Sequence, residues 1–259
     1  MILQTNPEYL YTNFEKFPPE NAKRLMKMIL NEDKDWLDYR SRFSNLYDQS
    51  NYESPLQSMV MRAGHRLSER PFNENGFFSN VLEIGSGTGE HLKFVRHKFD
   101  SYILTDADEK TLQISEEKLV DHYSGKLKFE KQNAESLLYS DGSFDRVIAT
   151  HVLEHLYKPH LVLKEWRRVL RVGGILSVLI PTDPGVAWRL GRHLGPRKKA
   201  IAQGIKYDYV MAREHVNSCS NLIALLRYYF PHSKEAWWPF SVGSIDLNLF
   251  FAFHASIKK

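Results

Sequence analysis

Two hydrophobic patterns alternate through the middle of the chain, between about residues 78 and 182. Short apolar runs bounded by polar or glycine-rich turns predict strands, and longer stretches with apolar residues at helical spacing predict helices. The predicted strands are 81–84, 102–105, 126–131, a segment ending at Thr150, and 175–180. The predicted helices are 90–99, 109–124 and 159–170, the last ending in a glycine cap at Gly173 and Gly174. Five strands alternating with helices predict an α/β fold with a parallel, doubly wound sheet.

The two ends of the chain follow other patterns. Residues 1–75 predict a helical cap or lid with helices at 20–30, 33–49 and 56–68, and residues 76–259 form the main domain. Within that domain, residues 181–232 interrupt the alternation as a long, loop-like insertion, and a helix resumes at 220–230. Two apolar runs at 236–242 and 247–257 then predict a closing antiparallel hairpin.

Composition narrows the setting of the protein. The 259 residues are 42% hydrophobic and 25% charged, which is ordinary for a globular chain, and the net charge of +4 selects no class of partner. A single cysteine, Cys219, gives no internal disulfide framework and suits a reducing compartment. We expect a cytoplasmic protein, because we find neither a signal peptide nor an apolar run long enough for a transmembrane segment. The oligomeric state is left open.

The first predicted strand runs into a glycine-rich turn with glycines at 85, 87 and 89. Glycine permits positive φ and lets a ligand approach the backbone closely, so the turn predicts a nucleotide site. The dinucleotide fingerprint is G-x-G-x-x-G, but here the spacing is G-x-G-x-G and Glu90 stands at the next position. Glu83 adds a second carboxylate. The pattern therefore disfavours a nicotinamide enzyme and indicates a ligand with a cationic part.

The run E-I-G-S-G-T-G from Glu83 to Gly89 resembles motif I of the class I S-adenosylmethionine-dependent methyltransferases of the small-molecule type. The resemblance extends over about residues 78–182. It implies S-adenosyl-L-methionine as the cofactor, whose sulfonium and ammonium groups suit the acidic turn. It also implies a Rossmann-like methyltransferase fold with a mostly parallel, seven-stranded sheet, which the C-terminal hairpin completes.

Further cofactor contacts are expected at the ends of the next two strands. Asp106 follows the second strand about 20 residues after the glycine turn, where a carboxylate can accept hydrogen bonds from both ribose hydroxyls, while Asp108 caps the next helix. By resemblance, the turn at Asn133 and Ala134 holds the adenine, although the family usually has Asp in place of Asn133. The expected cofactor-binding residues are Glu83, Gly85, Ser86, Gly87, Gly89, His91, Asp106, Ala107, Asn133, Ala134, Thr150 and His151.

The fourth strand runs directly into His151-Val152-Leu153-Glu154-His155, which resembles the F-D-x-V…L-E-H region of small-molecule methyltransferases. This segment lies at the carboxyl end of a central strand, where open α/β sheets bind ligands. A hydroxyl acceptor needs a base, and histidine titrates near neutral pH. We name His151 and His215 as candidate catalytic bases. The order of the residues differs from the zincin pattern H-E-x-x-H, so no metal is expected.

The insertion at 181–232 is the predicted acceptor-binding region, because a long polar segment beside an active site is usually functional. Its excess of Arg and Lys indicates an acceptor with phosphate or carboxylate, although a solvated basic surface is the alternative. The candidate acceptor-binding residues are Arg189, Arg213, Tyr207 and His155.

The sequence thus predicts methyl transfer to oxygen or nitrogen of a small, anionic acceptor, such as a sugar or glycan intermediate or a lipid head group. RNA methylation is the first alternative, but nucleic acid is not expected as a partner. The family's RNA-base amino methylases usually carry N/D-P-P-Y/F after the fourth strand, where this chain has Thr150-His151-Val152-Leu153. A non-catalytic, cofactor-binding regulatory module is the second alternative. The identity of the acceptor is left open.

Overall fold

The computed structural model describes residues 20, 34–36, 38, 39, 42, 55–123 and 125–258. The chain divides into two compact units, Met1–Phe43 and Ser44–Lys259. In the first unit, the rings of Trp36 and Tyr39 lie 5.7 Å apart and Arg42 pairs with Asp38, as expected for residues three and four apart on a helix. Most of the predicted helices at 20–30 and 33–49 lie outside the described residues.

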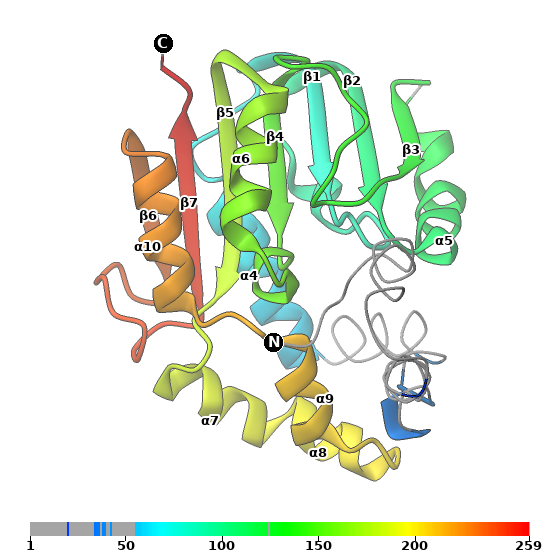
Figure 1. Ribbon diagram of the computed structural model, residues 1–259, viewed down its shortest axis with the longest axis vertical. Coiled ribbons are helices and arrows are strands. Elements are labelled where there is room, and N and C mark those ends of the chain that lie inside the picture. Colours follow the sequence, from blue (N-terminus) through cyan, green and yellow to red (C-terminus); the bar gives the residue numbers. More distant parts are fainter. Residues whose placement is uncertain are drawn as a thin grey trace. The chain divides into compact units, whose positions relative to one another are not determined.

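The second unit is built on a seven-stranded sheet with the order β3-β2-β1-β4-β5-β7-β6 (Figure 1). Every neighbouring pair is parallel except those of β7, which runs antiparallel to β5 and β6. The predicted mostly parallel, doubly wound sheet is therefore confirmed. The strands are β1 (Phe77–Ile84), β2 (Lys98–Asp106), β3 (Leu127–Lys131), β4 (Phe144–Thr150), β5 (Leu170–Pro181), β6 (Ser233–Trp238) and β7 (Phe250–Ser256).

Successive residues of each central strand point to opposite faces of the sheet, and both faces are covered. Leu82 and Val147 face a core that includes Trp166 of α6 (Pro159–Val169) and Leu226 of α10 (Cys219–Tyr229). In Figure 1, α6 and α10 lie together over this face. The opposite face is covered by α4 (Pro55–Glu69), the short 3₁₀ helix η1 (His91–Phe94) and α5 (Glu109–Leu119). Two further 3₁₀ turns are η2 (Val120–His122) and η3 (Leu153–His155).

The helix α4 belongs to the second unit, although its sequence position places it in the predicted N-terminal cap. Its apolar residues Met61 and Leu67 join a core with Leu179 of β5 and Phe250 of β7. The last residue of α4, Glu69, is buried against the sheet. Residues 55–69 therefore form part of the body of the second unit.

The predicted helix at 90–99 is wrong. Only η1 forms, because the chain turns to an extended conformation at Val95 (φ −66°, ψ 122°) and enters β2 at Lys98. Pairing of Phe78 with Phe99 in the β1–β2 ladder takes priority over a helix. Leu92 and Phe99 still share a core, as their apolar spacing required, but one lies on a 3₁₀ turn and the other on a strand.

The glycine cap predicted for α6 is also wrong. The helix ends at Val169, and β5 begins at once with Leu170. The register of β5 against β4 shifts there, so Gly173 and Gly174 accommodate a bulge. Gly173 has φ +83°, and a Cβ on Gly174 would lie 2.9 Å from the carbonyl oxygen of Arg171. These glycines therefore serve the irregular start of a strand and not the end of a helix.

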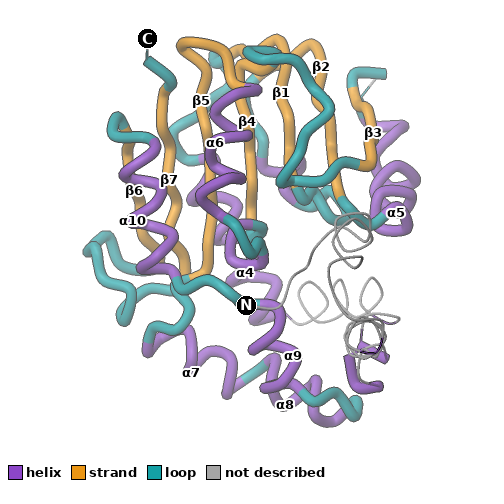
Figure 2. The backbone as a smooth tube through the Cα atoms, in the orientation of Figure 1, coloured by secondary structure: helices purple, strands orange, loops and turns teal. Residues whose placement is uncertain are grey.

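The insertion is helical and not loop-like (Figure 2). It contains the short helices α7 (Val186–Leu194), α8 (Pro196–Ala202) and α9 (Tyr207–Glu214) before α10. Its glycines lie at the breaks around them: Gly185 precedes α7, Gly195 separates α7 from α8, and Gly204 (φ +79°) follows α8. In Figure 1, α7–α9 lie beyond the carboxyl ends of β4 and β5.

The closing hairpin forms as predicted, although β6 starts and ends earlier than the predicted 236–242, and Phe250 packs in the core. Among the described residues, the structure contains no helix that is both long enough and apolar enough to cross a lipid bilayer.

Candidate active site

The glycine turn follows β1 with all three glycines in the left-handed region, at φ +64°, +54° and +78°. A Cβ on Gly85 would lie 2.4 Å from Val152, and a Cβ on Gly89 would lie 2.3 Å from Leu119 of α5. A Cβ on Gly87 would meet no atom within 4 Å. Gly85 and Gly89 are therefore required by close packing, whereas Gly87 borders open space.

A pocket opens at this turn, between the carboxyl ends of β1 and β4. It brings together six of the predicted cofactor-binding residues: Gly85, Ser86, Gly87, His91, Thr150 and His151. The remaining lining residues are His65, Thr88 and Glu90. The sequence indicated Glu90 only as an acidic neighbour, and His65 was missed because it lies on α4, 18 residues before the motif that begins at Glu83. Gly89 is not among the lining residues, since it packs against α5.

Glu83 lies buried beneath the turn and does not line the pocket. One carboxylate oxygen accepts a hydrogen bond from the Tyr102 hydroxyl at 2.6 Å, and the other has no hydrogen-bond partner among the described residues. Burial raises the pKa of Glu83, and the nearby His91 and the Tyr102 hydrogen bond offset this only in part. A direct contact of Glu83 with the cofactor therefore stays a prediction.

The other predicted cofactor residues lie on neighbouring strand ends. Asp106 ends β2, and its carboxylate accepts hydrogen bonds from the backbone N–H groups of Gly87 at 3.0 Å and Asp108 at 2.9 Å. Burial raises the pKa of Asp106. Ala107 is exposed, and Asp108 caps α5 as predicted. Asp106 thus binds the glycine turn directly and stands beside the pocket.

The turn after β3 is held by its own side chain. Asn133 is exposed, and its Oδ1 accepts a hydrogen bond from the Glu135 N–H at 2.9 Å. The carbonyl oxygen of Ala134 accepts one from the Trp166 indole at 3.1 Å. Asn133 and Ala134, which are predicted to hold the adenine, therefore lie on a turn that is bonded to α6.

A buried polar layer supports the pocket from below. Arg146 of β4 donates two hydrogen bonds to the Glu69 carboxylate, at 2.6 and 3.0 Å, and its guanidinium carbon lies 3.7 Å from the centroid of the Phe72 ring. His91 Nε2 lies 3.0 Å from the same carboxylate, and His91 Nδ1 lies 3.0 Å from His65 Nδ1. Burial would raise the pKa of Glu69, but Arg146 and His91 outweigh it and lower that pKa to about 2.

This layer sets the protonation of the pocket wall. Burial and the neighbouring His91 and His151 lower the pKa of His65 well below its usual value, so His65 is neutral at physiological pH. With His91 Nε2 donating to Glu69, its Nδ1 accepts from His65 Nδ1–H. The chain Glu69–His91–His65 therefore fixes both pocket histidines in position.

His151 is the one non-glycine residue with positive φ in the described part of the chain, at +59°. Its N–H donates to the Leu179 carbonyl at 2.9 Å, which ties this conformation to β5. Its Nδ1 lies 3.7 Å from a carboxylate oxygen of Glu154. Its Nε2 is buried and has no hydrogen-bond partner among the described residues. Such backbone strain is typically retained at functional sites.

A second group of titratable side chains lies where η3 meets the insertion, and we call it the insertion cluster: Glu154, His155, Asp183, Glu214 and His215. His155 Nδ1 lies 2.9 Å from the Glu214 carbonyl oxygen and 3.3 Å from its carboxylate. His215 Nδ1 lies 2.8 Å from the Asp183 carboxylate. The rings of His155 and His215 have centroids 5.1 Å apart. The cluster thus joins the strand end that carries His151 to α9.

The charges of the insertion cluster stabilise one another. Burial would raise the pKa of Glu154, but His151, His155 and His215 outweigh it and lower that pKa. Burial would lower the pKa of His155, but Glu214 and Glu154 raise it to about 9. Burial would also raise the pKa of Asp183, but His215 and Arg192 outweigh it and lower that pKa.

The structure brings together only part of the predicted acceptor site. Tyr207 accepts a hydrogen bond from Arg192 at 3.1 Å, and Arg192 reaches Asp183 of the insertion cluster at 3.4 Å. Arg213 donates instead to Tyr209 on its own helix, and Arg189 is exposed on α7. The sequence missed Arg192, Asp183, Glu154 and Glu214 as site residues, since only the fold brings the insertion to η3.

Residues 82–178 match the family model described as a methyltransferase domain. Over these residues the chain is therefore similar to methyltransferase domains, in agreement with its resemblance to the class I S-adenosylmethionine-dependent methyltransferases. Such a domain implies S-adenosylmethionine as the cofactor, as the glycine turn indicated.

The chain is similar to curated proteins over part of its length. It is 34% identical over 158 residues to the ubiquinone/menaquinone biosynthesis C-methyltransferase of Hahella chejuensis, over 57% of this chain and 64% of that protein. It is 32% identical over 153 residues to the enzyme of the same name from Rickettsia prowazekii, over 54% of this chain and 59% of that protein. The chain thus spans less than two thirds of either relative.

Solved structures agree on the fold. The chain superimposes on the CurJ carbon methyltransferase with a TM-score of 0.60 and 16% identity, over 99% of this chain and 72% of that one. It superimposes on a Thermotoga maritima methyltransferase, described as a possible histamine N-methyltransferase, with a TM-score of 0.55 and 21% identity, over 83% of this chain and 98% of that one. At these identities the likeness concerns the fold alone.

Proposed function

We propose that this methyltransferase transfers the methyl group of S-adenosylmethionine to an oxygen of a small acceptor, with His151 as the general base. The observation that carries the proposal is the placement of His151. It lines the same pocket as Gly85 and Gly87, and it is held there in a strained conformation with an unpartnered Nε2. A buried ring nitrogen without a hydrogen-bond partner is a costly arrangement that a reacting proton would explain.

The pocket residues fit the proposed cofactor. Gly87 leaves open space where a side chain would otherwise stand, and the Glu90 carboxylate at the pocket wall suits a cationic group. Asp106 and Asn133 follow the next two strands, on the side where the ribose and adenine would extend. When bound, S-adenosylmethionine supplies an electrophilic methyl group on a positively charged sulfur.

His151 would act on the acceptor hydroxyl. The Nε2 lone pair accepts the hydroxyl proton while the oxygen forms its bond to the methyl group, and the bonding electron pair stays with sulfur. The resulting imidazolium is stabilised by Glu154, 3.7 Å from Nδ1. His65 and Thr150 on the pocket wall help to exclude water from the reacting atoms. An amine acceptor would arrive unprotonated and would need this base less.

The acceptor would bind on the side of the insertion cluster. His215, the other predicted base, does not line the pocket and has its Nδ1 occupied by Asp183, so we assign it to acceptor binding. Arg192 and Tyr207 lie beside it and support a polar or anionic acceptor, such as a sugar intermediate or a lipid head group. Arg189 and Arg213 stay candidates for contacts farther along the same acceptor.

Methylation at carbon is the second candidate, favoured by the names of the relatives. Two of them are described as C-methyltransferases of ubiquinone and menaquinone biosynthesis. In such a reaction, removal of a proton from an enol or phenol makes the neighbouring carbon nucleophilic. His151 would serve there as the same base, acting on the same kind of hydroxyl.

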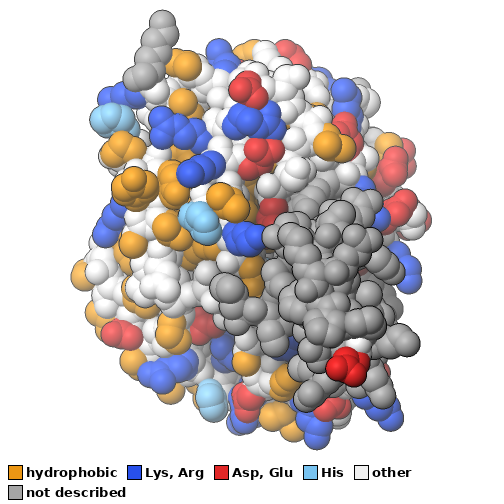
Figure 3. Space-filling view, viewed as in Figure 1, with side chains coloured by type: hydrophobic (Ala, Val, Ile, Leu, Met, Phe, Trp, Pro, Cys, Tyr) orange, Lys and Arg blue, Asp and Glu red, His pale blue; other side chains and the backbone are white. Residues whose placement is uncertain are grey.

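Nucleic acid is left outside the proposed acceptors. On the described part of the face that carries α6 and α10, basic and acidic side chains are interspersed (Figure 3). A nucleic-acid surface typically concentrates Lys and Arg on one face. A regulatory module without catalysis would not explain the strained backbone conformation of His151.

A substitution of His151 tests the proposal. Asparagine tolerates positive φ, so His151→Asn keeps the backbone and removes the base. We expect S-adenosylmethionine affinity by calorimetry to change by less than about 5-fold, and kcat to fall by about 10²–10⁴-fold. The assay uses labelled methyl donor with sugar phosphates, phospholipids and enolisable phenols as acceptors. Binding of NAD without binding of S-adenosylmethionine would overturn the cofactor, and full activity of the variant would overturn the base.

A further inference from the structure

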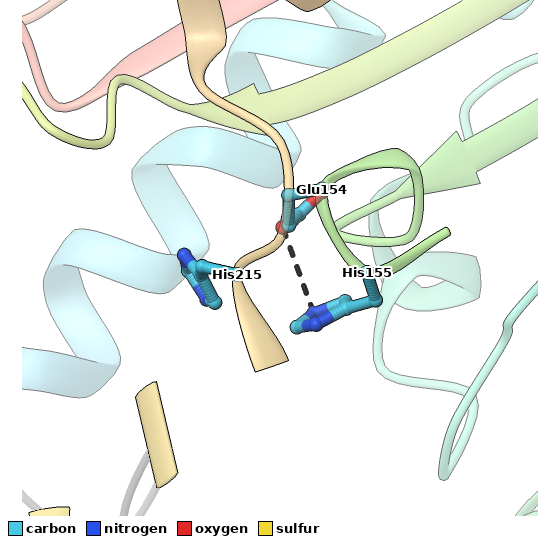
Figure 4. A group of neighbouring side chains, drawn as sticks. All are labelled: Glu154, His155 and His215. Carbon is cyan, nitrogen blue, oxygen red and sulfur yellow. Dashed lines mark ion pairs between the residues drawn. The ribbon is translucent and has the colours of Figure 1, made fainter. Parts of the chain in front are cut away.

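Three side chains of the insertion cluster converge on one point from two parts of the chain. Glu154 and His155 come from η3, directly after β4, and His215 follows α9, 60 residues later. Figure 4 shows Glu154 and His155 reaching toward the side where His215 lies. Each residue offers one nitrogen or oxygen atom, and these three atoms lie within 4.8 Å of one another.

Both imidazoles are oriented in the way that metal ligands are. A metal-bound histidine almost always donates its second N–H to a carboxylate or a backbone carbonyl, which fixes the tautomer. His155 Nδ1 lies 2.9 Å from the Glu214 carbonyl, and His215 Nδ1 lies 2.8 Å from the Asp183 carboxylate. With Nδ1–H donating in both rings, Nε2 is the atom of each ring that can bind a metal ion, and at His155, whose pKa is about 9, the ion displaces the Nε2 proton.

The third side chain has an unused acceptor. Glu154 is buried, with 3% of its side chain exposed, and its Oε2 has no hydrogen-bond partner among the described residues. A buried carboxylate oxygen without a partner is costly, and a bound cation would satisfy it. Its Oε1 lies 3.9 Å from His155 Nε2. The carboxylate therefore has one oxygen near the His155 ring and one buried oxygen without a partner among the described residues.

The separations suit an ion between the three groups. Bonds of about 2.0–2.2 Å place two ligands of one ion about 3.0–4.2 Å apart. The 3.9 Å between Glu154 Oε1 and His155 Nε2 falls in this range, and because the three ligand atoms all lie within 4.8 Å of one another, no separation exceeds it by more than a fraction of an ångström. Small rotations of the half-buried imidazoles would close that difference. Two imidazoles with one carboxylate favour a divalent transition metal ion and leave coordination positions open.

We propose that Glu154, His155 and His215 bind a divalent transition metal ion, and that this ion holds the acceptor by its oxygens beside His151. The second half rests on the proposed function. The ion would lie next to Glu154, whose carboxylate also lies 3.7 Å from His151 Nδ1 at the pocket wall. The open positions favour an acceptor with two neighbouring oxygens, such as a diol, a catechol or a hydroxycarboxylate. The order of residues in the sequence concealed this site, because the third ligand comes from the insertion.

Metal binding is measured first, without any acceptor. Untagged protein is stripped with a chelator and titrated with Zn²⁺ and, separately, with Mn²⁺ by calorimetry, with metal analysis after equilibrium dialysis. We expect one ion per chain. Failure of both ions to bind the wild-type protein would overturn the site.

Matched variants locate the ion. His155→Ala, His215→Ala and Glu154→Gln should each weaken binding by about 100-fold or more, and Asp183→Asn by about 10-fold through loss of the His215 partner. The control is His160→Ala, which removes an exposed histidine from α6. Circular dichroism and melting curves identify variants that fail to fold, and Glu154→Gln keeps the volume of the buried side chain. Equal binding by the control and the ligand variants would refute the assignment.

A parallel measurement separates this inference from the proposed function. S-adenosylmethionine affinity is determined with metal-free protein, which should retain it within about 3-fold, because the ligands do not line the cofactor pocket. Intact cofactor binding without metal binding overturns the metal site alone. Metal binding without cofactor binding overturns the proposed function. Methyl transfer that is lost on chelation and restored by Zn²⁺ or Mn²⁺ supports the acceptor role, and transfer indifferent to chelation overturns that role.

Discussion

The three glycines of the turn differ in what a side chain would meet. Gly87 borders open space at φ +54°, so Gly87→Ala adds about 1–2 kcal/mol of backbone strain but no collision. The added methyl group would stand where the cofactor approaches the turn. We expect a small loss of stability and a loss of S-adenosylmethionine affinity of about 10-fold or more, measured by denaturation and by calorimetry.

Gly173→Ala is the matched control for this experiment. Gly173 has φ +83° and open space around it, but it lies at the start of β5, away from the carboxyl edge that bears the pocket. It should lose similar stability and keep full cofactor affinity. Equal affinity losses in the two variants would show that backbone strain, and not the occupied space, affects the ligand.

At the scale of single residues, the sequence correctly predicted roles that depend only on neighbours in the chain. Asp106 and Asp108 were assigned correctly to a strand end and a helix cap, because both roles depend on neighbours in the chain. Contact of Glu83 with the ligand stays a prediction, while its carboxylate is buried beneath the turn and bonded to Tyr102. His65 was missed because only the packing of α4 brings it to the pocket.

At the scale of elements, the contact between α4 and β4 depends on the pairing of Glu69 with Arg146. Both side chains are almost fully buried, at 2% and 0% exposure. Glu69→Gln would leave the guanidinium uncompensated, and we expect a loss of about 3–5 kcal/mol in the free energy of unfolding, measured by urea denaturation. His65 and His91 would lose their fixed positions, so cofactor affinity should fall as well.

A double-mutant cycle checks the mechanism. Arg146→Met with Glu69→Gln removes both charges, so the loss in the double variant should be smaller than the sum of the two single losses. Additive losses would show that the two side chains contribute independently and would contradict the pairing.

The predicted boundaries of elements were wrong where strand pairing in the sheet overrode the local preference of the sequence. The apolar spacing at 90–99 suits a helix, but the β1–β2 ladder extends Lys98 and Phe99. The glycines at 173 and 174 resemble a helix cap, yet they serve a bulge between β4 and β5. In the insertion, Gly185 and Gly195 suggested a loop, whereas Gly185 precedes α7 and Gly195 separates α7 from α8. The mostly parallel, doubly wound, seven-stranded sheet needed no such detail and was predicted correctly.

For the whole molecule, the buried histidines predict sensitivity to acid. His254 of β7 is buried beside Ser177, and burial together with the charge of Arg146 lowers its pKa from 6.5 to about 3. The unfolded chain therefore takes up a proton near pH 6.5, while the folded chain does so only near pH 3. The stability contributed by neutral His254 is complete above pH 6.5 and is lost progressively as the pH falls toward 3.

The comparison of wild type with His254→Gln isolates this effect. Between pH 7 and pH 5, the wild type should lose about 2 kcal/mol more unfolding free energy than the variant. Denaturation curves at several pH values provide the measurement. Parallel pH profiles of the two proteins would refute the assignment, since other histidines titrate equally in both.

The pairing of Glu69 with Arg146 also bears on how this protein has diverged. The two positions stand 77 residues apart, on elements that no sequence motif connects. Loss of either charge alone is costly, whereas loss of both is tolerated more readily. In an alignment of relatives, these positions should therefore be substituted together. A histidine at position 65 should be found in the relatives that keep this pair. The reason is that the packing of α4, which places His65 at the pocket, depends on the pair.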